Sequence, residues 1–208
     1  MDCKSLKEDE MKILSWKLNS IILIVILMVL GAIWSKENHD QKLRQQRDYL
    51  LEKAQIEFKL TKWVYENSTL ISRATCQEIV RAVMKTKYPT LMLAIIELES
   101  KKFTPGALSS KGAIGWCQVM FEDRAGKDIH GKELFKAGII KEKRDLWDIT
   151  PNIKSGEFIL DQKLVKGKGD VTKALEGYLG EADGKYVLRI LSTYANLNML
   201  ILRKEEGK

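Results

Sequence analysis

One carboxylate of this 208-residue chain stands where proton-transfer chemistry could occur. Apolar residues recur at three- and four-residue spacing in the helix expected from Pro89, and Glu99 falls on the edge of the stripe formed by Ile95 and Ile96. Burial disfavours the charged form of a carboxyl, so the pKa of Glu99 should rise toward the range of a general acid. The alternative is a solvated acid at a helix end, and periodicity alone favours neither interpretation.

The segment that follows this acid is rich in turn formers. Residues 100–120 contain a serine pair, three glycines and Gln118, and they run into a second apolar stretch. Glycines let a backbone approach a ligand closely, and the amide of Gln118 offers both a donor and an acceptor to a sugar or to Glu99. Each residue also has a local interpretation: glycine in a turn, Gln118 as a helix cap, and Tyr178, farther along, as a core residue.

The residues from Glu99 to Gln118 resemble the motif of lytic transglycosylases, goose-lysozyme-like enzymes that cut the glycan strand of peptidoglycan. The family pattern is roughly E-S-x-F-x-P-x-A-x-S-x-x-G-A-x-G-L-M-Q, and the chain follows it in order. There are two departures. One extra lysine separates Ser100 from Phe103, and Trp116-Cys117 replace Leu-Met.

A second block of family positions follows in three short segments. They are Asp148 with Asn152-Ile153 and Gly156, then Ala174-Leu175 with Tyr178, and then Tyr186-Val187. Leu179 stands where the family usually has an asparagine that helps to line the saccharide groove, and Gly180 stands where it has alanine. The resemblance covers about residues 75–194, more than half of the chain.

The resemblance implies a reaction with a single acid. Glu99 would protonate the β-1,4 glycosidic oxygen between N-acetylmuramic acid (MurNAc) and N-acetylglucosamine (GlcNAc), and would then take the proton of the MurNAc C6 hydroxyl as a 1,6-anhydro product forms. Ser109, Gln118 and Tyr178 would bind substrate, with Tyr178 as the tyrosine beside the acid. The resemblance implies no metal and no other cofactor. Two alternatives stay open: a lysozyme-type hydrolase that uses water, and a non-catalytic glycan-binding or assembly protein, which Leu179 raises.

An unbroken apolar run from Ile21 to Trp34 predicts a membrane segment. Extended back to Leu18, it would be about 26 Å long as a helix, close to the minimum for crossing a bilayer. Trp16 and Trp34 bracket it, as interfacial aromatics do. A cleaved signal peptide is the alternative, but acidic residues in the leader and the lack of an A-x-A-like site favour an uncleaved anchor.

We therefore expect four parts: a cytoplasmic tail (1–17), a transmembrane signal anchor (18–34), a charged helical stalk (35–70) and a mainly α, lysozyme-like transglycosylase domain (71–208). Peptidoglycan lies outside the cytoplasmic membrane. The prediction is thus a single-pass inner-membrane protein with its catalytic domain in the periplasm or extracytoplasmic space. The anchor and the small size suggest localised wall opening alongside secretion, conjugation or phage-infection machinery.

Within the domain, capping signals predict where helices begin. Thr75 to Lys87 reads as an amphipathic helix, with Thr75 and Glu78 at capping-box spacing. Pro89 suits the first turn of the next helix, and Asp170 suits the cap of a helix that follows a glycine-rich turn at 167–169.

Composition limits the partners and the chemistry. The net charge of +7 favours an anionic partner, but no dense Lys/Arg tract interleaved with aromatics appears, so we do not expect nucleic acid. Cys76 and Cys117 are either a disulfide or, as we favour, two buried thiols. The two histidines have no Cys/His spacing for zinc, and a Ser-His-Asp triad on His130 is disfavoured.

Overall fold

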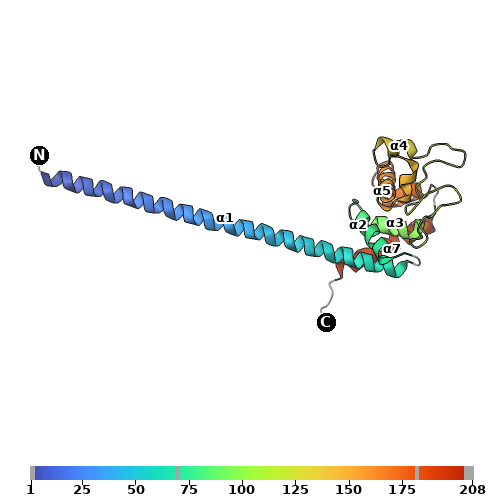
Figure 1. Ribbon diagram of the computed structural model, residues 1–208, viewed down its shortest axis with the longest axis horizontal. Helices are drawn as coiled ribbons and strands as arrows, with labels where there is room; N and C mark the ends of the chain where they lie inside the picture. The colour runs from blue at the N-terminus through green and yellow to red at the C-terminus, as the bar shows by residue number, and fades with distance from the viewer. Residues whose placement is uncertain (1–2, 69–70, 181–182, 204–208) are drawn as a thin grey trace. The chain divides into compact units, whose positions relative to one another are not determined.

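The computed structural model describes residues 3–68, 71–180 and 183–203, with side chains from residue 28 onward except 29 and 32. Contacts divide the chain into two units, Met1–Lys53 and Ala54–Lys208. In the described residues the fold is helical, with only isolated β-bridges, which confirms the predicted mainly α class (Figure 1). The elements are α1 (Cys3–Asn67), α2 (Arg73–Val83), α3 (Pro89–Glu99), α4 (Gly131–Lys136), the 3-10 helix η1 (Lys143–Trp147), α5 (Ile149–Lys166), α6 (Val171–Leu179) and α7 (Gly184–Leu202).

The first unit is the N-terminal part of α1. Residues 33–67 contain no glycine or proline, and the structure has them in one continuous helix, as predicted for the stalk. In the part of the chain that the structure describes, no helix combines the length and the apolarity that a bilayer crossing needs. The predicted tail and most of the predicted membrane segment, residues 18–27, 29 and 32, lie outside the described side chains, so the anchor stays a prediction.

The second unit begins earlier in the chain than the sequence indicated. We expected the domain to start at residue 71, whereas the compact unit starts at Ala54 and includes the end of α1. Leu60 and Val64, four residues apart, are fully buried, so they place one face of this helix in the core. The last turns of the predicted stalk are therefore part of the domain.

The helix starts are set by caps, two of which were predicted correctly. Pro89 opens α3, and the Asp170 side chain caps α6 by accepting a hydrogen bond from the Lys173 N–H. The predicted start of α2 is wrong. Its cap is Ser72, whose Oγ accepts from the Thr75 N–H at 3.1 Å, so Thr75 lies inside the first turn instead of capping it.

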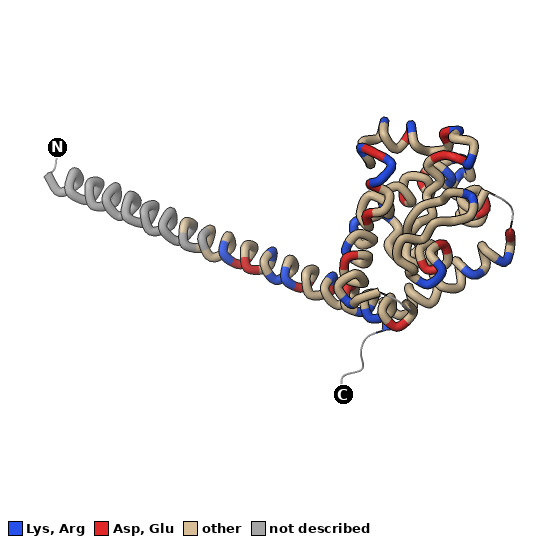
Figure 2. The backbone as a smooth tube through the Cα atoms, turned by 45° about the vertical axis from the view of Figure 1, so that its right-hand side comes forward, with Lys and Arg blue, Asp and Glu red and all other residues tan. Residues whose placement is uncertain are grey.

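Helix α3 lies at the centre of the second unit. Its residues 90–96 are all buried, and it packs against α2, α5 and α7. This helix carries no charge until Glu97 and Glu99 at its C-terminal end. Elsewhere Lys, Arg, Asp and Glu are interspersed along the described chain, without a block of one sign (Figure 2). The fold thus brings one apolar helix through the core and ends it on an acid.

Candidate active site

Glu99 is the last residue of α3, and its side chain is half-buried between α3 and α7. The hydroxyl of Tyr186, from the first turn of α7, donates a hydrogen bond to Glu99 Oε1. Burial raises the pKa of Glu99, and the Tyr186 hydrogen bond opposes that rise by stabilising the carboxylate. Neither influence on this pKa involves a second carboxylate.

Tyr186 is held in place by the cap of its own helix. Asp183 Oδ1 accepts the backbone N–H groups of Lys185 at 2.9 Å and of Tyr186 at 3.3 Å, which fixes the first turn of α7. The Tyr186 side chain is only 8% exposed. Burial and the neighbouring charge of Glu99 raise the pKa of its phenol, so Tyr186 remains protonated and remains a donor.

Tyr178, on α6, neighbours the acid, as the resemblance implied, but makes no hydrogen bond to it. Its hydroxyl donates to the backbone carbonyl of Cys117 at 2.9 Å. Burial raises the pKa of the Tyr178 phenol, and the charge of Glu99 contributes to the rise, so the two side chains are electrostatic neighbours. The role that we expected of Tyr178 at the carboxylate belongs to Tyr186. Sequence matching had marked Tyr186 as a family position without giving it a role.

The loop between α3 and α4 folds back on itself around Gly115. Ile114 and Val119 exchange backbone hydrogen bonds of 3.0 and 2.9 Å, which closes a tight turn over Gly115 to Gln118. Gln118 has a positive φ of 48° and donates its side-chain amide to the carbonyls of Ala107, at 3.0 Å, and Gly115, at 2.9 Å. The amide nitrogen of Gln118 is thus committed to shaping the loop.

Asn152, on α5, attaches this turn to the helical core. Its side chain is fully buried; Oδ1 accepts from the Cys117 N–H at 2.8 Å, and Nδ2 donates to the carbonyls of Ile114 and Leu146 at 3.0 and 2.7 Å. Gly115 has a φ of +75°, and a Cβ there would lie 2.3 Å from Asn152 Nδ2. Two features therefore require glycine at position 115: its left-handed backbone conformation and its close approach to the Asn152 side chain.

Ser109 organises the loop farther upstream. Its half-buried Oγ accepts the backbone N–H groups of Lys111 at 3.2 Å and of Ala113 at 2.9 Å. The predicted site residues therefore have different positions. Glu99 and Tyr178 are electrostatic neighbours, whereas Ser109 and Gln118 make hydrogen bonds within the loop.

The other acids near the motif have structural partners. Glu97 Oε2 accepts from the Thr193 hydroxyl at 3.0 Å, on α7. Glu122 pairs with Lys143, and Asp123 Oδ1 accepts the N–H groups of Ala125 and Lys127.

Cys76 and Cys117, the two cysteines whose side chains the structure describes, are free and buried, which confirms two thiols over a disulfide. Cys117 packs on Gly156 of α5 so closely that a Cβ at position 156 would lie 2.6 Å from its Sγ. The family glycine at 156 thus makes room for the turn that Tyr178 holds through the Cys117 carbonyl.

Comparison with known proteins places this site in a family. Residues 78–185 match the model of the transglycosylase SLT domain, a range that contains Glu99, the loop, Asn152 and Tyr178 and ends one residue before Tyr186. No curated protein and no solved structure gives a significant match. Because the SLT match spans more than half of the 208 residues, the chain belongs to this family of lytic transglycosylases, whose substrate is the glycan of peptidoglycan.

Proposed function

We propose that the protein cleaves the β-1,4 bond between MurNAc and GlcNAc with Glu99 as its only general acid and base, and releases 1,6-anhydroMurNAc. The observation that carries this proposal is the environment of Glu99. Its half-buried carboxyl has a raised pKa, and Tyr186 donates to it. Such a group can be protonated before the reaction and ionised during it, which a single acid and base requires.

In the first step, protonated Glu99 transfers its proton to the glycosidic oxygen as the bond from that oxygen to the anomeric carbon of MurNAc breaks. Burial raises the pKa of Glu99 and so favours its protonated form before this step. The carbonyl oxygen of the substrate's own N-acetyl group stabilises the positive charge that develops at the anomeric carbon. The Tyr186 hydroxyl donates to the carboxylate that is left behind.

In the second step, the C6 hydroxyl of the same MurNAc attacks the anomeric carbon and closes the 1,6-anhydro ring. Ionised Glu99 accepts the hydroxyl proton and returns to its starting form. Most glycoside hydrolases use two carboxyl groups, one of them to act on a water or to form a covalent intermediate. Ring closure needs neither an activated water nor a covalent intermediate, so it needs no second carboxyl group. This agrees with the surroundings of Glu99, whose pKa is shifted by burial and by the Tyr186 hydrogen bond and by no other carboxylate.

The loop would form one wall of the saccharide groove. Tyr178 and Asn152 hold the turn at Cys117 from two helices. With the amide nitrogen of Gln118 bound within the loop, its Oε1 is the atom available to accept from a sugar hydroxyl. Ser109 would then act on substrate indirectly, through the loop that it organises.

Turnover of purified sacculi by the full chain tests the catalytic assignment. Wild type should release anhydro-muropeptides, identified by mass spectrometry, and Glu99→Gln should release none while still binding sacculi. Glu97→Gln is the matched control, because Glu97 lies on the same helix and is bonded to Thr193. Reducing products would identify a hydrolase instead, and binding without release by wild type would identify a non-catalytic glycan-binding protein.

We also propose that residues 18–34 anchor the protein in the inner membrane with the domain in the periplasm or extracytoplasmic space. The apolar run between Trp16 and Trp34 and the location of the substrate support this arrangement. It would suit localised wall opening for secretion, conjugation or phage infection. Protease treatment of spheroplasts should digest the domain and spare a tag at the N-terminus; protection of the domain would contradict the proposal.

A further inference from the structure

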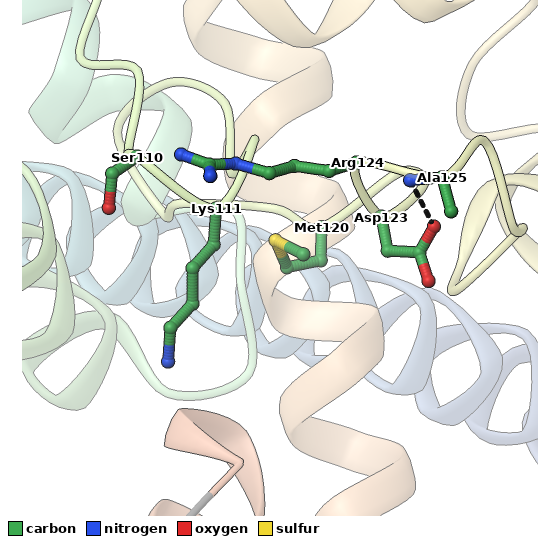
Figure 3. A pocket seen from close by; sticks show the side chains of 6 residues that line it. All are labelled: Ser110, Lys111, Met120, Asp123, Arg124 and Ala125. Atoms are coloured by element: carbon green, nitrogen blue, oxygen red, sulfur yellow. Dashed lines mark hydrogen bonds between the residues drawn. The ribbon is translucent and has the colours of Figure 1, made fainter.

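A cavity of about 440 Å³ lies in the loop that follows Glu99. It is lined by Ser110, Lys111, Met120, Asp123, Arg124 and Ala125 (Figure 3). Its two walls are the segments on either side of the Gly115 turn, and they meet where a Cβ on Gly112 would lie 3.7 Å from the Glu122 carbonyl. The cavity therefore belongs to the loop of the candidate active site, but the reaction proposed above uses none of its lining residues.

Two cations give this cavity its chemical character. Lys111 and Arg124 are exposed, and the ion pairs found among the described residues include neither of them. Figure 3 shows the Arg124 guanidinium extending toward Ser110 and the Lys111 side chain extending in another direction, with both cationic ends on the side of the cavity away from Asp123 and with Met120 between Lys111 and Asp123. The Arg124 guanidinium can donate two parallel hydrogen bonds to a carboxylate, the Lys111 ammonium can attract one by its charge, and the Ser110 hydroxyl can donate to one.

The one acid of the lining is already used by the backbone. Asp123 Oδ1 accepts the N–H groups of Ala125 and Lys127, each at 2.9 Å. Its carboxylate lies at the end of the cavity away from Lys111 and the Arg124 guanidinium (Figure 3). Asp123 therefore shapes the loop, and the two cations remain available to an anionic ligand.

The cavity is close to the reacting bond along the chain. Met120 comes three residues after Cys117, so their Cα atoms are at most about 10 Å apart. The Cys117 carbonyl accepts a hydrogen bond from Tyr178, and the charge of Glu99 contributes to the raised pKa of the Cys117 thiol. A glycan strand at Glu99 would thus lie beside the loop that contains this cavity.

We propose that this cavity binds the free carboxylates of the peptide stem that MurNAc carries, and so makes the enzyme prefer stem-bearing glycan with unamidated stems. The proposal rests on the function proposed above, because it supposes that a peptidoglycan strand lies at Glu99. The sugar rings themselves are uncharged, so the stem supplies the anionic groups that a pair of cations beside the strand can recognise. The Arg124 guanidinium would bind one stem carboxylate with two parallel hydrogen bonds, and the Lys111 ammonium would bind a stem carboxylate as a point cation.

The test uses the full chain and two preparations of the same sacculi, free of wall polymers. One preparation is native, and in the other the stem carboxylates are converted to amides with carbodiimide and ammonia. On native sacculi the double variant Lys111→Gln/Arg124→Gln should raise KM roughly two- to thirtyfold with little change in kcat, as expected for two solvent-exposed ion pairs. On amidated sacculi wild type and the double variant should have the same raised KM.

The control is Lys127→Gln/Lys132→Gln, which removes two exposed lysines of the same region that do not line the cavity. It should leave KM on both preparations at the wild-type value. The proposal is overturned if the cavity variant raises KM equally on native and amidated sacculi, if it leaves KM on native sacculi unchanged, or if the control variant has the same effect as the cavity variant.

Co-sedimentation with the same two preparations separates this proposal from the proposed function. If wild type releases no product, the catalytic proposal fails, and binding still reports on the cavity. Stronger binding to native than to amidated sacculi, lost in Lys111→Gln/Arg124→Gln, would then support recognition of the stem. Equal binding to both would overturn it.

Discussion

The attachment of the Gly115 turn to α5 depends on one side chain, and Asn152→Ala tests it directly. Asn152 is fully buried and makes three hydrogen bonds to backbone groups of two different segments. Alanine removes all three and leaves the helix itself intact, since alanine is the best helix former. The loss therefore falls on the loop, and through Cys117 on the contact with Tyr178.

The cost can be worked out from the partners that remain. The Ile114 carbonyl also accepts from the Val119 N–H at 2.9 Å, so it keeps one bond in the variant. The Cys117 N–H and the Leu146 carbonyl lose the bonds that Asn152 supplied. Each buried group left without a partner costs about 1–3 kcal/mol, so we expect about 2–6 kcal/mol in total. At the centre of that range Tm would fall by roughly 8–16 °C for a domain of this size.

Thermal unfolding followed by circular dichroism measures this loss, with Ser155→Ala as the matched control. Ser155 is also fully buried on α5, but its hydroxyl donates to the Pro151 carbonyl within the helix at 2.8 Å, so its removal should cost only about 1 kcal/mol. At a temperature where both variants are folded, Asn152→Ala should lower kcat on sacculi and Ser155→Ala should not. Equal losses of stability, or an Asn152→Ala enzyme with full activity, would refute the idea that this side chain positions the loop.

Three further predictions concern the acid and its surroundings. Tyr186→Phe removes the donor that stabilises ionised Glu99, so the pKa of Glu99 should rise further and the alkaline limb of the pH–activity profile should move to higher pH; an unmoved limb would contradict the assignment. Burial raises the folded-state pKa of Glu99 above its ordinary value near 4.5, so the folded chain binds the extra proton and stability falls as pH rises through that window. Glu99→Gln should therefore be more stable than wild type in urea unfolding at neutral pH, and the gain should disappear below about pH 4; a gain that is independent of pH would argue against it. Gly156→Ala should destabilise, because its Cβ would lie 2.6 Å from Cys117 Sγ, whereas Gly177→Ala meets only a flexible lysine chain at 3.3 Å and should be neutral or stabilising; the reverse order of melting temperatures would contradict the packing.

The sequence predicted the acid but not its partner. Helical spacing placed Glu99 at the end of a buried stripe, because the period of an α-helix is local and shows in a few residues. The hydrogen bond from Tyr186 joins residues 87 positions apart, and no local pattern carries that information. It depends on how α7 packs on α3, which is a property of the whole core. The same reason explains why Tyr178, which lies closer to the family motif, was given the role.

The loop hydrogen bonds of Ser109 and Gln118 were not predictable for a different reason. Both residue types can bond either a ligand or the backbone around them, and the sequence cannot distinguish the two uses. In the structure the loop backbone takes the Ser109 hydroxyl and the Gln118 amide nitrogen, because a long irregular segment has few other partners for its own polar groups. Asn152 shows the converse: it was noted only as a family position, and its contribution became visible once three backbone groups converged on it.

The extra lysine after Ser100 is accommodated by a turn of left-handed backbone conformation. The same turn packs against the end of α1, which explains why the domain includes that part of the helix. Lys101, Lys102 and Phe103 have φ angles of 51°, 64° and 61°, at a cost of about 1–2 kcal/mol per residue. The Phe103 side chain is fully buried and lies edge-on to Trp63, 5.9 Å between ring centroids, which together contribute about 2–4.5 kcal/mol. Two hydrogen bonds, from the Phe103 N–H to Ser100 Oγ and from the Lys102 N–H to the Glu97 carbonyl, add about 1–3 kcal/mol, so the turn roughly breaks even. Without Trp63 the turn would lose the aromatic pair, which contributes about 0.5–1.5 kcal/mol of this stabilisation. The last turns of α1 therefore pack in the core of the same compact unit and support the turn that follows Glu99.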